Sequence, residues 1–271
     1  MSDDEIGILF VLGCAGGAAW LVILIGLFAP WRCRVPLSVR WAGLLGPVVA
    51  MGGLVVVLTH FAAADVVNDE AYILYYFGLG AAWLGLALSL TPLLGLSLRD
   101  DVAERGNGAA LTTWTGAAIG VGACFAGANI GDGPGWWCVL WAAGLATAAL
   151  FVMWVILWRG SAVMEAISIE RDRAAGLRLG ALLGAAGLIA GRGAAGDWSG
   201  FFPTVVEFTQ AAWPLLPMLV LALLLERRWR PTAERPVGDQ WRQGVVPAGL
   251  WMACVLLAWW LAGPLPVVGA R

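Results

Sequence analysis

The chain has 271 residues, of which 61% are hydrophobic and only 13% are charged, with a formal net charge of −2. Soluble domains contain about 45–50% apolar and about 25% charged residues, so this composition excludes an ordinary soluble protein and indicates an integral membrane protein. The expected partner is therefore the lipid bilayer, and the near-neutral charge gives no reason to expect nucleic acid.

The apolar runs are close to 20 residues long, which is the length that a helix needs to cross a hydrocarbon core of ~30 Å. They do not alternate polar and apolar residues, which favours helices over a closed barrel. The sequence predicts an all-α membrane protein with eight transmembrane helices, at 6–29, 41–63, 71–96, 109–131, 136–158, 174–196, 201–225 and 245–266. We divide it into an N-terminal two-helix hairpin (1–69), a repeat core (70–225), and a cytoplasmic turn with the last helix (226–271).

The charges are distributed unevenly over the predicted loops. The N-terminus, MSDDE, is acidic, which argues against a cleaved signal peptide and for a retained first span. All sixteen basic residues are arginines, and fourteen of them lie in or beside four alternate connections: Arg32, Arg34, Arg40, Arg99, Arg105, Arg159, Arg171, Arg173, Arg178, Arg227, Arg228, Arg230, Arg235 and Arg242. Basic loops stay cytoplasmic, so we predict that both termini face outward. These arginines could also attract anionic headgroups, but a topology signal alone accounts for them.

A similarity with an offset of 65 residues links two parts of the chain. "GDGPGWW" begins at Gly131 and "GDWSGFF" begins at Gly196, so that Asp132 aligns with Asp197. The same offset places Asn107 on Asp172. The chain is thus predicted to consist of helical hairpins, each with an arginine-bearing turn. Internal repeats are common in membrane transport folds, although membrane domains also grow by duplication without a transport role.

Two glycine-rich segments carry a resemblance to a known family. "ERGNGAAL…AGANIGDGPG" and "IERDRAAGLRLGALLGAAGLIAGRGAAGD" resemble the repeat signatures of the bacterial membrane family catalogued as domain of unknown function 350. The resemblance covers roughly 70–225, and it departs from the family pattern at Asp172, where Asn is usual, and at Leu179, where many members carry Glu. It implies a multi-pass protein of the bacterial inner membrane, with a loose link to envelope stress. Matching positions are Glu104, Asn107, Ala109, Ala110, Glu170, Arg171, Gly176, Gly187, Leu188, Ile189, Gly196 and Asp197.

The sixth predicted span has small residues along one face. At 100° per residue, its glycines fall within one stripe: Gly176, Gly180, Gly184, Gly187 and Gly191. Such stripes let a neighbouring backbone approach closely, which is how helices associate in lipid. We expect spans 4 and 6 to be central packing helices, with permeation along the stripe as the alternative.

Two arginines fall inside the same span. Arg178 lies about one turn from its cytoplasmic end and is expected to reach toward water. Arg192 lies about one turn from the outer end, and we predict that it pairs with Glu207 across a short turn. There are two alternatives to this pair. Arg192 and Glu207 could belong to a polar pathway that includes Gln210, or Arg192 could simply extend to the surface.

Two further polar residues, His60 and Asn129, end spans on the predicted outer side. Histidine is the side chain whose charge ordinarily changes near neutral pH, so His60 could respond to protons, although a single histidine at a span end is more often an interfacial polar tip. Together with Arg192, Glu207 and Gln210, these residues form the candidate intramembrane polar cluster.

The sequence contains no recognisable catalytic motif. The chain has no phosphate loop, no zinc-protease motif and no nucleophile–base set. Its five cysteines show no paired spacing, so neither a disulfide framework nor a zinc site is indicated. We therefore expect no enzyme, no cofactor and no metal. The leading hypothesis is a structural or regulatory membrane component that acts through protein or lipid partners or as a homo-oligomer. The alternative is a small-solute or ion transporter with an outer polar pathway.

Overall fold

The computed structural model describes residues 2–29, 35–229 and 239–265. The described residues are all-helical, with 82% of them in helices. Within the described ranges there is no β-strand, and Ala62 and Gly131 form one isolated bridge. Four of the fourteen arginines used to predict orientation lie outside the described residues: Arg32, Arg34, Arg230 and Arg235.

The helices follow the predicted order along the chain. The first half holds α1 (Asp3–Phe28), α2 (Leu37–Ala42), α3 (Leu45–His60), α4 (Ala64–Val67), α5 (Glu70–Ser89), the 3₁₀-helix η1 (Thr91–Leu94), the π-helix η2 (Leu98–Glu104) and α6 (Gly108–Gly127). The second half holds α7 (Trp136–Gly160), α8 (Val163–Ser168), α9 (Arg173–Ala194), α10 (Phe201–Ala211), α11 (Leu215–Arg228), the π-helix η3 (Gln240–Val245) and α12 (Val246–Ala262).

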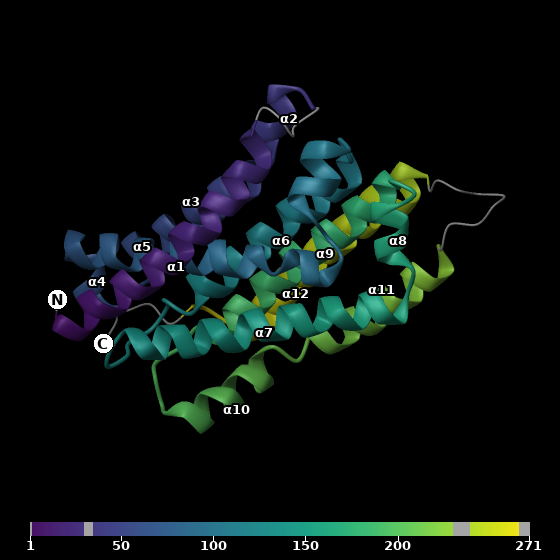
Figure 1. The fold of residues 1–271 in the computed structure, drawn as a ribbon. Helices are drawn as coiled ribbons and strands as arrows, with labels where there is room; N and C mark the ends of the chain where they lie inside the picture. Colours follow the sequence, from purple (N-terminus) through teal and green to yellow (C-terminus); the bar gives the residue numbers. More distant parts are fainter. Residues whose placement is uncertain (1, 30–34, 230–238, 266–271) are drawn as a thin grey trace.

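Seven of the eight predicted spans are confirmed as segments that are long and apolar enough to cross a membrane. Two of these segments combine neighbouring elements, α2 with α3 and η3 with α12. The segment predicted as one span at 201–225 is instead a pair of helices, α10 and α11, bent by 51°. The break has a local cause. Pro214 caps the start of α11, and proline cannot donate the backbone hydrogen bond that would continue α10. In Figure 1, α10 lies apart from the main bundle while α11 stays within it.

Helices α6 and α9 lie at the centre of the bundle and make its most extensive helix–helix contact (Figure 1). Their backbones touch because glycines face each other. A Cβ atom on Gly180 would lie less than 3.0 Å from the carbonyl oxygen of Thr112, and one on Gly187 would meet the backbone of Gly120. Gly176 and Gly191 approach α6 in the same way, at Ala109 and Ala123. This close approach is the small-residue packing that holds helices together in lipid.

Gly184 differs from the other glycines of the stripe. It is buried, yet a Cβ atom there would lie 3.7 Å from the Gly116 oxygen and 3.9 Å from Ile119 Cγ2. These are ordinary van der Waals distances. The close contact is therefore made by the other four glycines, and Gly184 has room for a methyl group.

The two ends of the bundle have different chemistry. We call one end the terminal face: it holds Ser2–Glu5, which share a pocket with 134–137, and the turns around Gly131 and Gly196. The opposite end, the arginine face, holds η2, α8, the end of α11 and η3. Its described arginines are Arg40, Arg99, Arg105, Arg159, Arg171, Arg173, Arg178, Arg227, Arg228 and Arg242. The charge asymmetry of the sequence therefore separates the two ends of the folded bundle.

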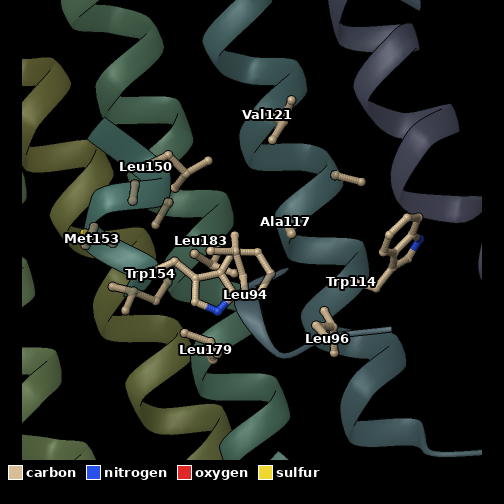
Figure 2. Packing of buried hydrophobic residues seen from close by; sticks show 14 of the residues in the cluster. Leu94, Leu96, Trp114, Ala117, Val121, Leu150, Met153, Trp154, Leu179 and Leu183 are labelled. Atoms are coloured by element: carbon tan, nitrogen blue, oxygen red, sulfur yellow. The ribbon is translucent and has the colours of Figure 1, made fainter. Parts of the chain in front are cut away.

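Large apolar side chains fill the space around α6 and α9. Figure 2 shows Trp154 of α7 among Leu94, Leu179 and Leu183, while Trp114 of α6 points to the opposite side. There the Trp114 indole donates to the Gly43 carbonyl at 2.9 Å. The two tryptophans thus anchor α6 and α9 to the flanking helices on either side.

Candidate functional site

A cleft of about 70 Å³ opens at the terminal face. It lies between α4, the end of α6, the start of α7, the end of α9 and α10. Its charged lining consists of four carboxylates, from Asp65, Asp132, Asp197 and Glu207, and among the described residues no arginine or histidine lines it. The volume suits a small ion or a few water molecules.

Two turns that share the 65-residue offset build the floor of this cleft. The Gly196 amide donates to the Ile130 carbonyl at 2.8 Å, and the Trp198 amide donates to the Asp132 carbonyl at 2.7 Å. In return, the Asp132 amide donates to Asp197 Oδ1 at 3.0 Å. Gly131 takes a φ of 115°, which L side chains rarely adopt, and a Cβ atom there would collide with Gly196. Glycine at this position lets the two turns bind each other directly.

Neutral oxygens in the cleft have no hydrogen-bond partner within the described chain. Asn129 is 5% exposed; its side-chain amide donates to the Phe125 carbonyl at 2.8 Å, which leaves Oδ1 without a partner. Tyr76 is 7% exposed, and its hydroxyl also makes no hydrogen bond there. Thr204 Oγ1 is buried and unpartnered. All three residues line the cleft, so neutral oxygens without a partner accompany the carboxylates.

The candidate polar cluster does not come together as a unit. Asn129 and Glu207 line the cleft, but His60, Gln210 and Arg192 do not. His60 is exposed, and its Nδ1 lies 2.7 Å from Thr59 Oγ1. Gln210 is exposed on α10. Sequence alone placed these residues at similar depth, and the structure spreads them around the bundle.

The predicted ion pair between Arg192 and Glu207 is wrong. Arg192 Nη2 donates instead to the carbonyls of Ala262 at 3.1 Å and Pro264 at 3.1 Å, at the end of α12. Glu207 accepts a hydrogen bond from the Ser199 hydroxyl at 3.0 Å. The arginine therefore satisfies carbonyls at a helix C-terminus, where a positive charge is favourable. The carboxylate stays in the cleft.

Arg178 corrects a second expectation, because it does not extend to water. It is 2% exposed, and it binds Glu226 of α11 through Nε–Oε1 at 2.7 Å and Nη2–Oε2 at 2.6 Å. Its Nη1 donates to the Gln243 carbonyl of η3 at 2.6 Å, and its guanidinium lies 5.3 Å from the centre of the Trp229 ring. Arg178 thus ties α9, α11 and η3 together. Glu226 was not singled out in the sequence, although it is the only acidic residue in its apolar run.

Asn107 and Asp172 take equivalent positions at the starts of α6 and α9. The side chain of each caps its helix: Asn107 Oδ1 accepts from Ala109 N at 3.0 Å, and Asp172 Oδ1 accepts from Ala174 N at 2.9 Å. Each follows a residue with a positive φ, Gly106 or Arg171. Asn107 also donates through Nδ2 to the Ile167 carbonyl at 2.7 Å, a bond that a carboxylate cannot make. These residues are structural caps on the arginine face.

Metal-site geometry is absent from the described residues, which contain no group of three or more His, Cys, Asp or Glu side chains placed to hold an ion. The four carboxylates of the cleft are thus too dispersed to chelate a metal together. Comparisons with protein-family models, curated proteins and solved structures found no match to this chain.

Proposed function

We propose that this chain is a structural or regulatory component of a bacterial inner membrane, active in envelope maintenance and acting through protein or lipid partners. One observation carries the proposal: α6 and α9 are locked backbone to backbone at the centre of the bundle. A centre of this kind suits a rigid scaffold. The small cleft at the terminal face lies beside this centre and does not run through it.

The proposal includes a topology. The bent pair α10–α11 counts as the eighth crossing, both termini lie outside, and the arginine face lies in the cytoplasm, as basic loops do. Reporter fusions test this assignment. A periplasmic reporter should be active after residue 198 and inactive after residue 170, and the reverse pattern would overturn the orientation.

The proposal also includes a repeated architecture. The equivalent caps at Asn107 and Asp172, and the paired turns at Gly131 and Gly196, support two hairpin units related by the 65-residue offset. We propose that these units are related to the repeats of the domain of unknown function 350 family.

A small-solute or ion transporter is the second candidate, and the cleft that contains Asn129 and Glu207 favours it. Reconstitution separates the two functions. Folded protein in liposomes should give no more flux of alkali cations, protons or small amines than protein-free liposomes. Deletion in the source cell should raise sensitivity to detergent or osmotic shock, and the wild-type chain should restore resistance. Protein-dependent flux that Glu207→Gln abolishes would replace the scaffold proposal with transport.

A further inference from the structure

The terminal-face cleft has a one-sided chemistry that calls for a positively charged ligand. Its charged lining is made of carboxylates alone, and the described residues place no arginine or histidine there to balance them. Arg192, the nearest basic residue in sequence to Asp197, is engaged by the α12 carbonyls. The carboxylates would therefore attract a cation that enters the cleft, and no basic side chain of the described lining would compete with it.

The neutral oxygens that line the cleft indicate which kind of cation would bind there. Asn129 Oδ1 and the Tyr76 hydroxyl belong to side chains more than nine-tenths buried, they line the cleft, and neither has a partner in the described chain. An oxygen without a partner in the protein is free to accept a hydrogen bond from a ligand, so a ligand that donates hydrogen bonds to it gains binding free energy.

The size and the spacing of the site exclude some ligands. No three carboxylates are placed to share one metal ion, so the set does not fit a chelated divalent cation. A cleft volume of about 70 Å³ favours a small cation over a large organic one. An ammonium group is small, carries one positive charge and presents three N–H donors that can reach separate oxygens.

From this set of observations we propose that the terminal-face cleft binds the primary ammonium group of a small amine. Asn129 Oδ1 and the Tyr76 hydroxyl accept hydrogen bonds from the ammonium, and the carboxylates of Asp132, Asp197 and Glu207 supply the negative field. The inference goes beyond the proposed function, because binding requires neither transport nor a protein partner.

The test is a titration of the purified full-length protein in lipid nanodiscs. The melting temperature is measured against rising methylammonium chloride at constant ionic strength, with tetramethylammonium chloride and sodium chloride as matched cations without N–H donors. Methylammonium should raise the melting temperature in a saturable manner, and the other two should not. Tyr76→Phe, which removes only the hydroxyl, should weaken the apparent affinity by about tenfold, as loss of one hydrogen bond to a charged group does.

Two further variants separate this site from general charge effects. Asn129→Leu should also weaken methylammonium binding, whereas Gln210→Leu, on the exposed side of α10, should leave it unchanged. If Asn129→Leu does not fold, Tyr76→Phe carries the test alone. The proposal is overturned if methylammonium gives no saturable shift, if sodium or tetramethylammonium reproduces the shift, or if Tyr76→Phe binds as the wild type does.

Discussion

Arg178 and Glu226 form a bidentate ion pair at the arginine face, with both side chains almost fully buried and 48 positions between them in sequence. A planar guanidinium facing a carboxylate with two parallel hydrogen bonds is among the strongest polar contacts in proteins. The pair joins the centre of the bundle to α11, and the bond to Gln243 extends it to η3.

Breaking this pair should be costly. Glu226→Gln leaves the Arg178 charge buried without its counter-ion, which destabilises proteins by ~3–5 kcal/mol. The free energy of unfolding in mixed micelles is the measurement. Arg242→Gln is the matched control, because Arg242 is exposed and lies 4.0 Å from Asp239; it should cost less than ~1 kcal/mol. Equal losses in both variants would contradict a special role for the buried pair.

Replacing glycines of the stripe by alanine should destabilise the protein at one position of α9 and stabilise it at another. Gly187→Ala should destabilise the protein by ~1–3 kcal/mol, because its Cβ atom would overlap the backbone of Gly120 and force α6 and α9 apart. Gly184→Ala should stabilise it by ~0.5–1 kcal/mol, because alanine costs less conformational entropy than glycine in a helix and the methyl group fits. Thermal unfolding of the two variants side by side checks this, and similar shifts would refute the close approach.

The two helix caps should respond differently to exchange of amide and carboxylate. Asn107→Asp keeps the cap but loses the donor to the Ile167 carbonyl, so we expect a loss of ~1–3 kcal/mol. Asp172→Asn keeps its cap as well and should change stability by less than ~1 kcal/mol, since Asn and Asp cap equally well. A larger loss of stability for Asp172→Asn would show that the Asp172 charge interacts with a further group in addition to capping the helix.

Arg192 and Glu207 should behave as independent residues. Arg192→Gln removes donors from the end of α12, and Glu207→Gln changes only the bond to Ser199. Side chains without a shared partner have additive effects, within ~0.5 kcal/mol. Unfolding of the two single variants and the double variant measures this. A strong non-additive term would restore the direct pair that the structure lacks.

The membrane explains why most of the fold could be predicted. The thickness of the hydrocarbon core fixes the length of an apolar run, so six predicted spans agree with the observed segments within five residues at both ends. The predicted span 71–96 extends seven residues beyond the end of α5 at Ser89. The segment predicted at 201–225 also begins at the observed Phe201, but an apolar composition does not distinguish a straight helix from the bent pair that the structure shows. The effect of Pro214 becomes visible only in the path of α10, which lies apart from the bundle.

The polar contacts could be predicted less well, for a different reason. Hydropathy gives the depth of a side chain but not its direction around the helix axis or the neighbour that it meets. Arg192 and Glu207 have similar depth, yet Arg192 turns toward α12. Arg178 lies near a span end, where extension to water is the simplest account, but Glu226 approaches it from another hairpin. The cleft residue Tyr76 was not singled out, because no short-range sequence signal separates it from Tyr72 and Tyr75.

The pairing of α6 with α9 also has a consequence for biosynthesis. About 65 residues separate facing glycines such as Gly116 and Gly180, so the ribosome completes α6 well before its partner exists. At ~5–20 residues per second this delay is roughly 3–13 s. Throughout that interval the glycine face of the nascent α6 must stay beside lipid, an insertase or an earlier helix. The central contact of the finished bundle is therefore among the later ones to form.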